Sequence, residues 1–152
     1  MYETDLSDAT VLPLFLMSEN LDLLLPKFLA LRPGTRIVKN GFEFTAWDYD
    51  EIGYLSGAAC DKWCVAYLYI VPARVSGLWR TDDGELELAQ EFQWLTGTLT
   101  SRGKRMPIER GRIQGDVIRF NAGDMRYTGR VIGDTIVGQI AGEYSPRWSA
   151  RR

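Results

Sequence analysis

The feature that most constrains the fold is a repeated segment in the second half of the chain. Gly111–Ile118 and Gly129–Ile136 are similar to one another, and each has Gly-Asp at its centre between β-forming residues. This pattern is typical of a two-residue hairpin turn whose first position has a positive φ. Gly123-Asp124 provides a third turn of the same kind between the two copies. The turns therefore predict antiparallel hairpins.

Apolar and polar side chains alternate along the same half of the chain. Leu86 and Leu88 alternate with Glu85 and Glu87, a period of two that turns one face of a strand toward a core. The residues expected on the inward face of the later strands are Ile118, Phe120, Ile136 and Ile140. We predict six or seven antiparallel strands from Leu86 to Trp148, forming a meander that curls into a partial barrel.

The aromatic and basic residues of this half have two possible interpretations each. Three tryptophans could form a stacking platform for bases, but we expect them to plug the ends of a small barrel: Trp79, Trp94 and Trp148. The arginines and lysines could contact phosphate, but alternation places them on the outward face among acids. We expect a solvated barrel exterior.

The composition changes near Pro72. Residues 1–71 contain five basic and ten acidic side chains, whereas residues 72–152 contain thirteen basic and ten acidic ones. The change predicts two domains: an α/β unit over residues 1–71 and a small antiparallel β domain over residues 72–152.

The first unit has the pattern of a parallel sheet with a crossover helix. Ala9–Met17 is a continuous apolar run, as expected of a strand buried on both faces. A helix over Asn20–Leu31 and a strand over Thr35–Val38 follow, and Val65–Val71 gives a third buried strand. One helix cannot cover both faces of such a sheet, so the predicted fold class is an α/β partial doubly wound sheet followed by the β-meander or partial barrel.

Composition also excludes several kinds of function. The chain has no histidine, which rules out Ser-His-Asp and Cys-His nucleophile systems and histidine metal sites. The net charge of −2 argues against nucleic acid as a partner, and no apolar run is long enough for a membrane span. The first residues lack a basic signal region, so we expect a cytoplasmic protein.

The two cysteines and the grouped carboxylates are the remaining candidates for chemistry. Cys60 and Cys64 could be a redox pair or half a metal site, but we expect reduced thiols and no metal. Two acidic groups could hold an acid/base pair, although turn formation is the default role for such residues: Asp48, Asp50 and Glu51, then Asp82 and Asp83.

Three stretches of the first unit carry a resemblance to a known family. Tyr2–Leu12, Leu21–Phe28 and Pro33–Val38, followed by aromatic residues, resemble the later part of a class I S-adenosylmethionine-dependent methyltransferase. The resemblance covers roughly Tyr2–Val71, and the second half is similar to the β appendage of some bacterial members. It implies a truncated Rossmann-like methyltransferase half that transfers a methyl group to an unidentified acceptor.

The resemblance also implies site residues. The rim after the first strand would face S-adenosylmethionine, through Leu16, Met17, Ser18 and Asn20. Phe44 and Trp47 would wall the acceptor side. Ligands of open α/β sheets bind beyond the carboxyl ends of strands, which favours the same positions. The alternative is that Ser18 and Asn20 cap a helix and that Phe44 and Trp47 belong to the core; no catalytic residue is identified.

The chain departs from the family in its cofactor motifs. No Gly-x-Gly occurs, and the family's glycine-rich loop and two cofactor-binding acids would lie upstream of Met1. We therefore expect that the chain alone does not bind S-adenosylmethionine tightly. Two alternatives stay open: a non-enzymatic barrel that binds an apolar ligand or a protein through Trp79 and Trp148, and a split enzyme whose half-sheet self-associates or pairs with a complementary chain.

Overall fold

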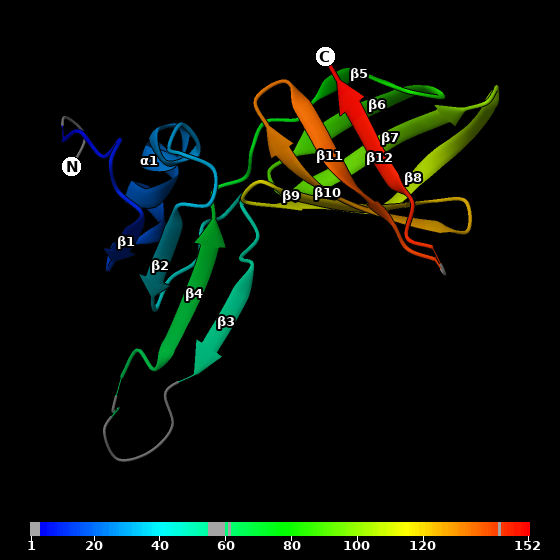
Figure 1. Cartoon of the computed structure of the whole chain (residues 1–152). Coiled ribbons are helices and arrows are strands. Elements are labelled where there is room, and N and C mark those ends of the chain that lie inside the picture. The colour runs from blue at the N-terminus through cyan, green and yellow to red at the C-terminus, as the bar shows by residue number, and fades with distance from the viewer. Residues whose placement is uncertain (1–3, 55–59, 61, 143) are drawn as a thin grey trace. The chain divides into compact units, whose positions relative to one another are not determined.

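The computed structural model describes residues 4–54, 60, 62–142 and 144–152 (Figure 1). The chain divides into two compact units, Met1–Pro72 and Ala73–Arg152.

The first unit contains a four-stranded sheet and one helix. Its elements are β1 (Val11–Leu14), α1 (Ser18–Leu29), β2 (Arg36–Asn40), β3 (Glu51–Tyr54) and β4 (Val65–Ile70). The strand order is β1-β2-β4-β3. β1 and β2 are parallel and are joined through α1, whereas β4 runs antiparallel to both β2 and β3.

Helix α1 buries one apolar face. Leu21, Leu24 and Phe28 recur at helical spacing and are buried, while Leu23 is exposed on the other side. Pro26 lies inside the helix and donates no backbone hydrogen bond. The apolar face of α1 packs against the segment that follows β2. The Phe28 ring lies 5.9 Å from the ring of Phe44 in that segment.

Three predictions for this unit are wrong. β1 is an edge strand with Val11 exposed, not a strand buried on both faces, which fits the presence of Pro13 in it. The third predicted strand, β4, is antiparallel. β3 begins at Glu51, one of the acidic residues for which turn formation was the default expectation.

The predicted fold class is also wrong. The described residues contain twelve strands and one helix, and eight of the strands form a closed antiparallel barrel. The molecule is thus nearly all β rather than an α/β doubly wound, Rossmann-like sheet. Parallel pairing is restricted to β1 and β2 among the strand pairs of the described residues, because the remaining connections are hairpins or antiparallel returns.

The second unit is the barrel. Its strands are β5 (Gly77–Thr81), β6 (Gly84–Glu91), β7 (Trp94–Ser101), β8 (Lys104–Gln114), β9 (Val117–Ala122), β10 (Met125–Ile132), β11 (Thr135–Ile140) and β12 (Arg147–Arg151). Each strand pairs with the next, and β12 returns to β5, so the predicted partial barrel is in fact closed (Figure 1). Closure removes the sheet edges that a meander would leave.

The glycine turns predicted from the repeat are confirmed. Gly115, Gly123 and Gly133 each have a φ of 57° or 58° and lie between consecutive strands from β8 to β11. The left-handed conformation suits glycine because it has no Cβ to clash with the backbone.

The barrel interior is filled by the predicted inward residues. Ile118, Phe120 and Ile136 are buried, and Ile140 packs against them. Trp79 is fully buried, and its Nε1 donates to the Val75 carbonyl at 2.8 Å. Trp94 differs from the prediction because it lies on the outside, 44% exposed.

The cysteines also differ from the prediction. Cys60 and Cys64 are joined by a disulfide, with their Cα atoms 5.8 Å apart, in the connection between β3 and β4. A pair of sulfurs bonded in this way is neither two reduced thiols nor half of a metal site.

The helix that the structure describes is too short to cross a membrane.

Candidate functional site

The candidate site lies where the two parallel strands of the first unit end. β1 ends at Leu14 and β2 ends at Asn40. Since β1 and β2 run in the same direction, their carboxyl ends meet at one edge of the sheet. In open α/β sheets ligands bind beyond the carboxyl ends of parallel strands, and this edge is the corresponding place in the present sheet.

The four residues predicted to face the cofactor lie on the short path from β1 into α1. Leu16 is half-buried, Met17 is 60% exposed and Asn20 is exposed. Ser18 is the first residue of the helix, and its side chain lies outside the described atoms. The helix cap position is Met17, which makes no side-chain capping bond. The cofactor-binding role of the four stays a prediction.

Lys39 is the residue of this site that sequence analysis missed. Its side chain is 0% exposed, and its Nζ donates to the Leu16 carbonyl at 2.9 Å. Burial lowers the pKa of Lys39 to about 8, because desolvation disfavours the charged form. Lys39 lies two residues after Ile37 in β2, and period-two alternation places both on the buried face. That alternation was the signal available in the sequence.

The two residues predicted to wall the acceptor side belong to an aromatic cluster. Trp47 is 1% exposed and Phe44 is also buried. Their rings are 5.5 Å apart, and each contacts the Tyr69 ring of β4, at 5.1 and 4.8 Å. The arrangement is that of a core, the alternative weighed from the sequence, and the acceptor-binding role stays a prediction.

Tyr69 fixes the chain segment that carries these rings. The Phe44 N–H donates to the Tyr69 hydroxyl oxygen at 3.1 Å. Burial raises the pKa of Tyr69 to about 12. The Thr45 N–H and hydroxyl both donate to the Asp22 carboxylate of α1, so the segment after β2 is tied to the helix as well.

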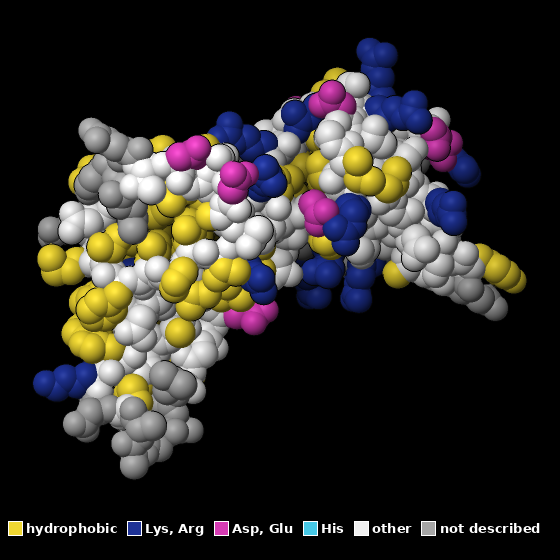
Figure 2. All heavy atoms as spheres, turned by 60° about the vertical axis from the view of Figure 1, so that its left-hand side comes forward, with side chains coloured by type: hydrophobic (Ala, Val, Ile, Leu, Met, Phe, Trp, Pro, Cys, Tyr) yellow, Lys and Arg dark blue, Asp and Glu magenta, His cyan; other side chains and the backbone are white. Residues whose placement is uncertain are grey.

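A second set of aromatic side chains is exposed beside the predicted cofactor segment. Phe15 is 61% exposed and Trp63 is 48% exposed, and their rings meet edge to face at 5.9 Å. The Trp63 ring also lies 4.9 Å from that of Phe42. Figure 2 shows hydrophobic side chains gathered on the face of the first unit that it draws.

The backbone around Trp63 is held in an uncommon conformation. Trp63 has a φ of 61°, which is rare for a bulky residue. The Asn40 amide donates to the carbonyls of Trp63 and Val65, at 2.7 and 3.1 Å. The end of β2 therefore fixes the exposed indole next to Phe15.

Acid and metal chemistry find little support in the described residues. No three of their His, Cys, Asp and Glu side chains gather as metal ligands would. Two of the carboxylates singled out from the sequence have structural partners: Asp50 accepts from the Ile70 N–H at 2.7 Å, and Asp83 pairs with Arg102 at 3.3 Å.

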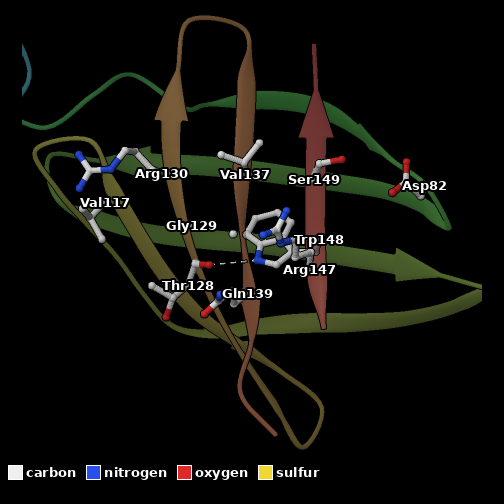
Figure 3. A pocket seen from close by; sticks show the side chains of 11 residues that line it. Asp82, Val117, Thr128, Gly129, Arg130, Val137, Gln139, Arg147, Trp148 and Ser149 are labelled. Atoms are coloured by element: carbon white, nitrogen blue, oxygen red, sulfur yellow. Dashed lines mark hydrogen bonds between the residues drawn. The ribbon is translucent and has the colours of Figure 1, made fainter. Parts of the chain in front are cut away.

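For an apolar ligand, the binding-module alternative expects Trp79 and Trp148 to line one cavity, and the described residues place these two side chains differently. Trp79 is packed in the core, whereas Trp148 borders a partly open pocket of about 110 Å³ together with Phe120 and Tyr127. Sites for drug-sized ligands are commonly 300–1,000 Å³. A larger groove of about 680 Å³ lies on the barrel, and both polar and apolar side chains line it (Figure 3). Its polar side includes Thr128, Arg130 and Gln139, and its apolar side includes Val117, Val137 and Trp148.

Comparison with known proteins gives one similarity. A protein-lysine N-methyltransferase of Saccharolobus islandicus (strain REY15A) is 34% identical to this chain over 71 residues. The matched stretch covers 46% of this chain and 43% of that protein, so the chain spans less than half the length of the relative. No protein-family model and no solved structure matches the chain. The similarity supports methyltransferase as the functional class at the level of a partial match.

Proposed function

We propose that this chain takes part in S-adenosylmethionine-dependent methyl transfer to a lysine side chain of a protein. The observation that carries the proposal is the 34% identity over 71 residues to a protein-lysine N-methyltransferase. We assign the matched function to the first unit, because among the described strands only β1 and β2 are parallel, and in open α/β sheets ligands bind beyond the carboxyl ends of such strands.

The donor would contact the segment from Phe15 to Asn20. S-adenosylmethionine supplies an electrophilic methyl group on a positively charged sulfonium. The exposed rings of Phe15 and Trp63 suit that charge, since a cation is attracted to an aromatic face. The chain lacks the family's glycine-rich loop and acidic partners, which would hold the adenosine part. For the loop this follows from the sequence, which has no Gly-x-Gly. The fit is therefore partial, and weak binding by this chain alone is expected.

Lys39 serves as a positioning residue in this proposal. Its ammonium group donates to the Leu16 carbonyl and so fixes the path from β1 to α1. The chain's share of the chemistry is to hold the two reactants in line and to exclude water, which is where much of the barrier reduction in such transfers arises. The acceptor amine must be neutral to attack, so it first loses a proton to solvent. The nitrogen–methyl bond would form as the sulfur–methyl bond breaks, and the sulfur would leave as a neutral thioether.

A nuclear magnetic resonance titration tests the proposal. The ¹⁵N-labelled chain is titrated with S-adenosylmethionine to millimolar concentration, with adenosine as the control ligand. We expect shifts of the backbone signals of Leu16, Met17 and Asn20, with a dissociation constant weaker than about 100 μM. Lys39→Met should reduce the shifts at these positions, whereas Leu23→Ala, an exposed helix position, should leave them unchanged.

Two results would count against the proposal. Shifts confined to residues 73–152 would place the donor on the barrel. Shifts with adenosine equal to those with S-adenosylmethionine would show that the sulfonium is not recognised. Micromolar binding would contradict the narrower expectation that the chain alone binds the donor weakly.

A further inference from the structure

One row of outward-facing side chains crosses six strands of the barrel without a carboxylate, and the register then continues from Trp94 to the exposed Glu91 of β6. The strand register joins its members in the order Trp94, Arg112, Arg119, Thr128, Gln139 and Arg147. We call these six residues the arginine row. Their sequence neighbours Ile113, Ile118 and Tyr127 are buried, so alternation turns the row outward.

The row concentrates positive charge at a cost to the fold. Arg112 and Arg119 are direct cross-strand partners, and like charges in such a pair are destabilising. The Arg112 guanidinium lies over the exposed Trp94 ring at 5.3 Å, whereas Arg119 and Arg147 are exposed. A carboxylate bound between the two guanidinium groups would offset this repulsion.

The row continues into the barrel groove of about 680 Å³. Thr128, Gln139 and Arg147 line the groove, and the next row adds Arg130 and Ser149. Figure 3 shows Thr128 and Gln139 next to one another, with Asp82 on the far side of the group from Arg130. The groove thus offers hydroxyl and amide groups beside the guanidinium groups of the row.

Two glycines leave room for the Trp148 indole at the groove. Gly129 and Gly138 are cross-strand partners, and the Trp148 indole crosses them to donate to the Thr128 carbonyl at 3.1 Å. A Cβ on Gly138 would lie 2.0 Å from the Thr128 oxygen and 2.7 Å from Trp148 Nε1. The indole thereby holds the Thr128 backbone in place through this hydrogen bond.

We propose that the arginine row and its groove bind an acidic segment of a protein partner in extended conformation. Guanidinium groups form strong forked hydrogen bonds with carboxylates. Arg119 and Arg147 are separated by three strand spacings, about 14 Å, and carboxylates four residues apart on an extended peptide are also about 14 Å apart on one face. The inference does not depend on methyl transfer by the first unit.

The charge around the row favours a peptide over nucleic acid. Glu109 and Asp116 lie close to the row, and Asp116 pairs with Arg130. Asp82 also lines the groove. A continuous phosphate backbone would meet these carboxylates, whereas a peptide with spaced acidic residues presents charge only where the arginines lie.

A binding titration of the full chain tests the proposal. The probe is a fluorescently labelled twelve-residue Gly/Ser peptide with glutamate at every fourth position. Controls are the same peptide with glutamine, a peptide with its glutamates adjacent, and an oligothymidylate of equal length. We expect the spaced glutamate peptide to bind most tightly and its affinity to fall as salt is added.

Variants locate the binding surface. Arg119→Gln and Arg147→Gln should each weaken binding about threefold to fivefold, the size expected of an exposed charge pair. Arg105→Gln makes the same charge change at an exposed position outside the row and should weaken binding less than about 1.5-fold. Arg119→Lys should recover part of the loss, and circular dichroism checks that each variant keeps its fold.

Four results would overturn the proposal. They are equal loss in Arg105→Gln, equal binding of the peptide with adjacent glutamates, tighter binding of the oligothymidylate, and no measurable binding of any peptide.

Discussion

The two units solve the problem of sheet edges in opposite ways. The barrel closes β12 on β5, so each of its strands has a partner on both sides. The sheet of the first unit ends at β1 and β3, and β1 exposes Val11. The barrel is therefore a stable scaffold with its distinctive charges outside, while the first unit keeps an open edge and exposed aromatic rings beside its candidate site.

The largest effect should come from the barrel core. Phe120→Ala removes a ring that stacks on Tyr127 at 4.9 Å and meets Trp148 at 5.7 Å. We expect the barrel to lose about 4 kcal/mol of unfolding free energy, from lost burial and the cavity left behind. Urea unfolding followed by residue-resolved hydrogen exchange measures it. If protection in the first unit falls by the same amount, the two units do not fold independently.

The next effect depends on pH and belongs to the first unit. The folded pKa of Lys39, about 8, lies below its usual value of 10.5, so the unfolded state binds more protons between these values. Stability should therefore rise with pH across this window, by up to about 3 kcal/mol, because the neutral amine is easier to bury. Lys39→Met should remove the rise, and unfolding at pH 7 to 10 measures it.

The pH dependence of stability caused by Tyr69 has the opposite sign, and it sets the highest pH at which the Lys39 experiment can be read. Its folded pKa of about 12 lies above the usual 10, so the unfolded state loses its proton first. Stability should fall as the pH rises from 10 to 12. A rise that persists in Lys39→Met would show that another group causes the pH dependence.

The disulfide should have a smaller effect, again confined to the first unit. Cys60 and Cys64 close a short loop, for which chain entropy predicts a stabilisation of about 2 kcal/mol. Reduction, or Cys60→Ser with Cys64→Ser, should lower protection in β3 and β4 and leave the barrel unchanged. Equal protection before and after reduction would mean that the bond contributes nothing to the fold.

The smallest effect on stability should come from the open edge. Val11→Lys places a charge on the exposed side of β1 and should change the free energy of unfolding by less than about 0.5 kcal/mol. It should nevertheless reduce self-association, which we expect the wild-type chain to show through this edge. Sedimentation over a range of concentrations measures the mass, and a wild-type monomer throughout would contradict the expectation.

The difference between the barrel and the first unit also explains which features the sequence could predict. The Gly-Asp turns and the alternation around Ile118 are local signals, and both are confirmed in the barrel. Closure is not local, because it requires β12 to meet β5 across the chain. In the first unit the helix is confirmed, but strand direction and edge position depend on partners distant in sequence, and both were wrong for β4 and β1.

The candidate site follows the same division. Sequence analysis reached the segment of Leu16 and Met17 through a family resemblance, while Lys39 was missed because a lysine in a strand is ordinarily exposed. Trp94 was expected to plug an end of the barrel, but it lies on the outside under the Arg112 guanidinium. Whether such a side chain is buried or exposed depends on its partners in neighbouring strands.

Photochemical crosslinking of methyl-labelled S-adenosylmethionine to the full chain tests the central claim, that the donor contacts the carboxyl end of β1. The labelled peptide is identified by proteolysis and mass spectrometry. We predict label between Phe15 and Asn20 or on Trp63, reduced in Lys39→Met. Label found only on peptides of the barrel, or label unaffected by an excess of unlabelled donor, would contradict the account.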